Sequence, residues 1–249
     1  MNDSKQKEIV ILILCLLIGF ALRFYAFDRK SLWIDEIHTF NDSRDGIQKQ
    51  LKYYKENPAY LHPPLFFVLT HLFYPFKNPE RDLRIIPLIL GVLSIPMFYL
   101  LSRQFSPNIA IPCTLSLTFM TYHIYLSQNG RPYSLIMFAG MAGLYLFMRH
   151  LKTFQKRYLI PAAFFFVVLF YTSYSSIQFV VLSQILWFYR LREDNKKPTL
   201  SSLAILNGII FCLCLPIDAS HTDSVQSPLR TICTLDSSPS IELRTPSFV

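Results

Sequence analysis

The sequence predicts an all-α, multi-pass transmembrane protein, and three observations support this fold class. Hydrophobic residues make up 52% of the 249 residues and charged residues only 16%, a balance that makes a polar-surfaced soluble globule hard to assemble. Long apolar segments recur along the chain. The basic residues lie mostly at the ends of these segments, so the net charge of +8 indicates membrane topology and not nucleic-acid binding.

The apolar segments predict about seven spans, because a hydrocarbon core about 30 Å thick takes roughly 17 to 25 helical residues. They are residues 9–27, 85–101, 109–126, 134–148, 158–172, 176–189 and 200–215. The shorter ones need flanking Tyr, Trp and Arg to reach across. A signal peptide is the alternative for the first segment, but that segment is long and no small-residue cleavage site follows it.

Two segments between the first two spans predict helices in the membrane interface. Residues 62–76, HPPLFFVLTHLFYPF, begin with two prolines and are short for a span. Residues 46–57 place Ile47, Leu51 and Tyr54 on one helix face, with lysines elsewhere. Together these helices form either a lid over a polar site or a surface-lying linker.

With the 62–76 segment lying in the interface, basic groups follow every second connection. This pattern predicts an inner (plasma) membrane protein with a cytoplasmic N-terminus. Residues 28–84 then form the first extracytoplasmic loop, on the same face as residues 127–133 and 172–175. The two polar motifs SLWIDEIHTF (31–40) and SQNGRPY (127–133) are therefore expected to meet over one site.

The adjacent carboxylates Asp35 and Glu36 are the candidate catalytic residues. Trp33 and Ile37 favour the membrane interface, so the pair is expected in a partly desolvated belt that would suit a general base. The alternative is a solvated loop pair or a helix N-terminal charge, with Lys30 nearby.

Five sequence pieces carry a resemblance to a known family: LRFYAFDRKSLWIDE, HPPLFF, RIIPLILGVLSIPMFYLLSRQF, HIYLSQNGRPYSL and LFYTSYSS. In this order the chain, from about residue 9 to 216, resembles membrane glycosyltransferases of the GT-C fold, specifically the dolichyl-phosphate-mannose protein mannosyltransferase-like group, glycosyltransferase family 39. The resemblance implies that residues 1–216 are the N-terminal part of a GT-C transmembrane domain. It also implies transfer of a hexose or pentose from a polyprenyl-phosphate carrier to a lipid, glycan or protein acceptor outside the cytoplasm. The implied partners are that donor and membrane lipid, with no nucleic acid.

The resemblance places Asp35 at the catalytic centre, with Glu36 beside it. Because a lipid phosphate is already an activated leaving group, the enzyme chiefly needs a base for the acceptor hydroxyl. Arg131 and Arg84 are candidate ligands of the donor phosphate, since a guanidinium binds phosphate oxygens in a bidentate fork. An interfacial anchor that snorkels to lipid headgroups is the alternative for Arg131.

Further side chains are predicted to line the acceptor site: Gln128, Tyr133, His62 and Tyr174. A divalent metal (Mg, Mn or Zn) is a further hypothesis, with His38 and His62 as ligands, because His38 follows Asp35 by three residues and would share its helix face. A hydrogen-bonding role in the aromatic belt is the alternative for these histidines.

Three departures from the family pattern support alternative functions. Asn129 stands where relatives usually carry an acidic residue, and Ser173 stands where His is expected. Residues 217–249 are rich in Ser, Thr and Pro and predict a disordered tail, either out of frame or a natural polar extension. A truncated, catalytically inactive remnant is therefore an alternative to an active enzyme. A transporter subunit is a weaker one, because few ionisable residues lie within the spans.

Overall fold

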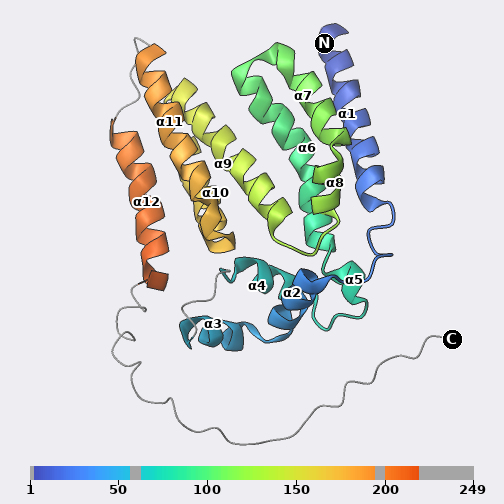
Figure 1. Cartoon of the computed structure of the whole chain (residues 1–249). Coiled ribbons are helices and arrows are strands. Elements are labelled where there is room, and N and C mark those ends of the chain that lie inside the picture. The colour runs from blue at the N-terminus through green and yellow to red at the C-terminus, as the bar shows by residue number, and fades with distance from the viewer. Residues whose placement is uncertain (1–2, 57–62, 194–199, 219–249) are drawn as a thin grey trace, which may run out of the picture.

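The structure is a computed structural model that describes residues 3–56, 63–193 and 200–218. Every regular element in these ranges is a helix. Figure 1 shows long helices side by side in a bundle, with short helices gathered at one end. The chain is therefore an all-α membrane protein, as the composition predicts.

Each predicted apolar segment corresponds to helix in the bundle. The bundle helices are α1 (Asp3–Phe24), α6 (Ile85–Phe105), α7 (Pro107–Phe119), α8 (Thr121–Ser127), α9 (Tyr133–Thr153), α10 (Leu159–Thr172), α11 (Ile177–Glu193) and α12 (Leu200–Asp218). Helix α9 lies at the centre and packs against α6 and α10, while α1 packs against α6 and α7. Small residues permit this packing: a Cβ on Gly143 of α9 would lie 3.3 Å from the Phe166 ring of α10.

The predicted count of seven spans is not confirmed. Two segments of the described chain, Pro79–Phe105 and Tyr133–Thr153, are long and apolar enough to cross a membrane. A third qualifies if α7 and α8, bent by 60° at their junction, form one broken span. Helix length is one reason, because α10 has 14 residues and α11 has 17, fewer than the roughly 20 that a span requires.

A buried arginine stabilises the bend between α7 and α8. Met120 is extended there, with φ −65° and ψ 107°, which leaves the last carbonyls of α7 without helical partners. Arg23 of α1, fully buried, donates to the carbonyls of Leu117 at 3.1 Å and Thr118 at 3.2 Å. It also donates to His123 Nδ1 of α8 at 2.8 Å. Arg23 therefore fixes the direction in which α8 leads into residues 128–132.

The short helices are α2 (Ile34–Arg44), α3 (Ile47–Glu56), α4 (Leu65–His71) and α5 (Pro79–Asp82). Figure 1 places them together at the end of the bundle where α8 ends and α9 begins. The predicted helix at residues 46–57 is α3, whose Ile47 and Leu51 are exposed. The predicted interfacial segment 62–76 contains α4, but Phe66 and Phe67 are buried, because α4 packs between α2 and α10.

Candidate functional site

The first turn of α2 carries a buried ion pair. Glu36 accepts two hydrogen bonds from Arg84, with Nε to Oε1 at 2.8 Å and Nη2 to Oε2 at 2.6 Å. Both residues are almost fully buried, at 1% and 3% exposure. The backbone N–H of Trp33, which precedes α2, donates to Oε2 at 3.3 Å. This fork-to-fork geometry is the strongest form of the arginine–carboxylate interaction, and it fixes the start of α2.

Arg84 also binds the chain that leads from α1 to α2. Its Nη1 donates to the carbonyls of Phe27 at 2.9 Å and Lys30 at 2.8 Å, and its Nη2 donates to the Ser31 carbonyl at 3.2 Å. With the two bonds to Glu36, all five guanidinium donors have protein acceptors. The predicted role of Arg84 as a phosphate ligand does not fit this geometry, because no donor remains for a phosphate oxygen.

The second polar motif contacts the same carboxylate. The backbone N–H of Gly130 donates to Glu36 Oε1 at 2.6 Å, and the indole N–H of Trp33 donates to Asn129 Oδ1 at 3.2 Å. A Cβ on Gly130 would lie 3.1 Å from both Glu36 Oε1 and Leu83 Cβ, so a larger residue would crowd this contact. The two motifs therefore meet, as predicted from the sequence.

Arg131 reinforces the contact between the two motifs. It is buried, at 6% exposure, and its Nη1 donates to the Asp35 carbonyl and to Thr39 Oγ1, both at 3.2 Å. The Thr39 hydroxyl itself donates to the Asp35 carbonyl at 3.2 Å. An exposed anchor that snorkels to headgroups does not describe Arg131, because its guanidinium lies under α2.

Asp35 lies in a different environment from Glu36. It is half-buried, and its carboxylate makes no hydrogen bond or ion pair with any residue that the structure describes. Its neighbours Ile34 and Ile37 are exposed, at 67% and 44%. His38, one turn further along α2, is also exposed. The two adjacent acids therefore differ sharply: Glu36 is bound on all sides, and Asp35 is accessible.

The remaining predicted site residues are spread around this end of the bundle. The Gln128 amide donates to the carbonyls of Arg23 at 3.0 Å and Tyr25 at 2.9 Å, so it caps the end of α1. Tyr133 begins α9 and is half-buried, whereas Tyr174 is 44% exposed in a short 3-10 helix, Tyr174–Ser176. His62 lies outside the described residues.

A small cavity of about 130 Å³ opens beside the ion pair. Its walls include Lys30, Trp33, Tyr125 and Gln128 together with the Glu36–Arg84 pair, but not Asp35. The sequence alone did not single out Tyr125, and it suggested Lys30 only as a partner of the acids. The sequence does contain a signal for both residues: Lys30 directly precedes the motif at residues 31–40, and Tyr125 lies just before the motif at residues 127–133.

The metal hypothesis is not tested by this geometry. Within the described ranges, no three side chains of His, Cys, Asp or Glu gather in a way that could hold a metal ion. Because His62 lies outside those ranges, the proposed pairing of His38 with His62 stays a prediction.

The fold and the site define a membrane protein whose polar loops converge on buried charges at one end of a helical bundle. The particular family follows from comparison with known sequences. Residues 61–217, more than half of the chain, match the family described as dolichyl-phosphate-mannose-protein mannosyltransferase, and the chain belongs to that family of GT-C membrane glycosyltransferases. The match begins after α2, so it does not include Asp35 or Glu36. A comparison with curated proteins gave no match.

Proposed function

We propose that this chain transfers a sugar from a polyprenyl-phosphate carrier to a hydroxyl of a lipid, glycan or protein acceptor on the non-cytoplasmic face of the inner membrane. Family membership supports the glycosyltransferase chemistry and the general class of donor. The placing of basic residues supports the choice of face. Clusters of Lys and Arg occupy the short connections at the opposite end, around residues 103, 149–157 and 190–193, and the positive-inside rule assigns such connections to the cytoplasm.

The contrast between the two adjacent carboxylates carries this proposal. Both oxygens of Glu36 are bound by protein donors, so Glu36 cannot reach an acceptor hydroxyl without breaking the buried pair with Arg84. Asp35 is accessible, and its backbone carbonyl is held by Arg131. We therefore assign the reactive role to Asp35 and a positioning role to Glu36.

The proposed reaction needs one base and one stabilised leaving group. Asp35 takes the proton of the acceptor hydroxyl, and the acceptor oxygen forms a bond to the anomeric carbon of the sugar. The bond from that carbon to the phosphate oxygen breaks, and polyprenyl phosphate leaves with the electron pair. Positive charge near the phosphate lowers the cost of this step. Arg131, next to the Asp35 backbone, and Lys30, at the small cavity, are the cations that we propose for it.

Transfer from a defined donor tests this proposal. The full chain is expressed in cells that lack the native gene, and the membranes are supplied with polyprenyl phosphate that carries radiolabelled mannose. We expect label in membrane acceptors with the parent chain and with Asp28→Asn, since Asp28 is an exposed acid of the same loop. Asp35→Asn should abolish transfer. Transfer by Asp35→Asn at the parent rate would refute the assignment.

Two observations favour a second function, that of a non-catalytic member of the family. Asn129, where relatives usually carry an acid, has its side-chain oxygen hydrogen-bonded to the Trp33 indole. Ser173, where the resemblance leads us to expect His, contacts the Ser175 hydroxyl at 2.8 Å. Under this alternative, the parent chain and both variants would be present in the membrane at equal amounts and none would transfer label.

A further inference from the structure

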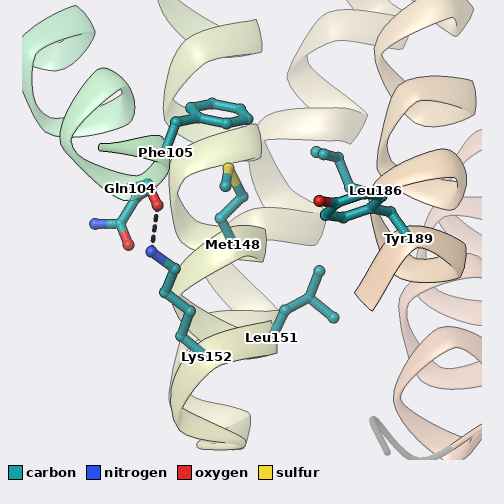
Figure 2. A pocket seen from close by; sticks show the side chains of 7 residues that line it. All are labelled: Gln104, Phe105, Met148, Leu151, Lys152, Leu186 and Tyr189. Carbon is teal, nitrogen blue, oxygen red and sulfur yellow. Dashed lines mark hydrogen bonds between the residues drawn. The ribbon is translucent and has the colours of Figure 1, made fainter. Parts of the chain in front are cut away.

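A second cavity, of about 340 Å³, lies at the end of the bundle opposite the polar site. It is formed between the C-terminal end of α6, the last turns of α9 and the middle of α11. Figure 2 shows Met148 and Leu151 of α9 facing Leu186 of α11, which together form an apolar wall. Lys152 and Gln104 form the polar rim on the other side.

The depth of this cavity in the membrane follows from the two best-supported spans. Pro79–Phe105 and Tyr133–Thr153 are the segments long and apolar enough to cross, and both end at the cavity. Gln104 is the second-last residue of α6, and Lys152 is the second-last residue of α9. The rim of the cavity therefore lies where lipid headgroups begin, and its apolar wall lies at the depth of the acyl chains.

Positive charge surrounds the rim. Lys152 donates from Nζ to the Gln104 carbonyl, one of the last carbonyls of α6, and this contact holds the ammonium over the cavity. In the described helices and turns at this end, basic residues outnumber the acidic residues Asp3, Glu8 and Glu193. The basic residues include Arg103, Arg149, Lys156 and Arg157. A basic pocket between membrane helices with an apolar wall below it matches an anionic phospholipid.

We propose that this cavity binds one anionic phospholipid of the surrounding membrane. The charge of Lys152 attracts the headgroup phosphate, while Tyr189 lines the cavity next to Leu186, across from Lys152. One acyl chain packs along Met148 and Leu186. The site is separate from the proposed donor site at the other end, and it holds whether or not the chain transfers sugar.

Native mass spectrometry of the purified full chain tests the proposal, with phosphatidylglycerol and phosphatidylcholine of identical acyl chains as probes. We expect phosphatidylglycerol to be retained on the parent chain and phosphatidylcholine to be retained several-fold less. Lys152→Ala should weaken phosphatidylglycerol binding roughly fivefold, the effect of one lysine charge near a membrane surface. Lys156→Ala is the matched control, because Lys156 is an exposed lysine of the same end that does not line the cavity.

A second variant tests the apolar wall independently of charge. Leu186→Trp fills the cavity and keeps Lys152, so it should also release phosphatidylglycerol while the melting temperature stays unchanged. Equal weakening by Lys152→Ala and Lys156→Ala would show general surface attraction and overturn the proposal. Equal retention of the two lipids by the parent chain, or full retention by a folded Leu186→Trp, would overturn it as well.

Discussion

Removing one partner of the Glu36–Arg84 pair should destabilise the protein strongly. Glu36→Gln keeps the shape of the side chain but leaves the Arg84 guanidinium buried, at 3% exposure, without its counter-charge. Loss of one member of a buried pair costs about 3–5 kcal/mol. An exposed pair provides the comparison: Lys49 and Asp45 are 2.8 Å apart, but their side chains are 73% and 45% exposed. Such a pair contributes about 0–1 kcal/mol, so Asp45→Asn should change stability little.

The assay is a denaturant titration of the purified full chain in mixed micelles, with a double-mutant cycle on Glu36→Gln and Arg84→Gln. The double variant should be much less destabilised than the sum of the two single variants, because the second substitution removes the charge that the first left unpaired. Additive single effects of less than about 1 kcal/mol each would refute the account, since they would mean that the pair is open to water.

Three further substitutions probe the contacts around the pair. Gly130→Ala places a Cβ 3.1 Å from the carboxylate and from Leu83 and should cost about 1–3 kcal/mol in the same titration, whereas Gly46→Ala, with nothing within 4 Å, should be neutral. Gln128→Ala removes the cap on the last carbonyls of α1 and should cost about 1 kcal/mol, seen as faster hydrogen exchange at that helix end. Trp33→Phe removes the hydrogen bond to Asn129 and should lower the denaturation midpoint. The fluorescence of the remaining tryptophan, Trp187, should change little.

Apolar length and basic flanks were enough to predict the helices and the convergence of the two polar motifs. Every predicted apolar segment is helical, and Gly130 of the second motif contacts Glu36 of the first. The count of spans was not predictable in the same way. Helix ends depend on local breaks such as the bend at Met120, which Arg23 stabilises from a distant part of the chain.

The division of roles between Asp35 and Glu36 also required the structure. Adjacent residues on a helix point about 100° apart, so adjacency alone does not say which acid faces the protein. The buried face of α2 is polar, with Glu36, Thr39 and Ser43, while Ile34 and Ile37 are exposed. The rule for soluble proteins, that the apolar face of a helix is buried, would predict the opposite face of α2 to be buried. The partners of Arg84 could not be predicted from the sequence either, because most of them are backbone carbonyls, which every residue has.

The most direct test of the central claim, that Asp35 serves the chemistry and Glu36 the architecture, is the rate of sugar transfer per folded molecule for Asp35→Asn and Asp35→Glu. Because the Asp35 carboxylate makes no bond with any described residue, both variants should unfold at the parent's denaturant concentration. We predict that Asp35→Glu keeps part of the rate and that Asp35→Asn loses about 10²- to 10⁴-fold, the contribution of a general base. If Asp35→Asn kept its rate within about twofold of the parent at unchanged stability, the loss of rate would be far smaller than a general base contributes. That result would contradict the claim.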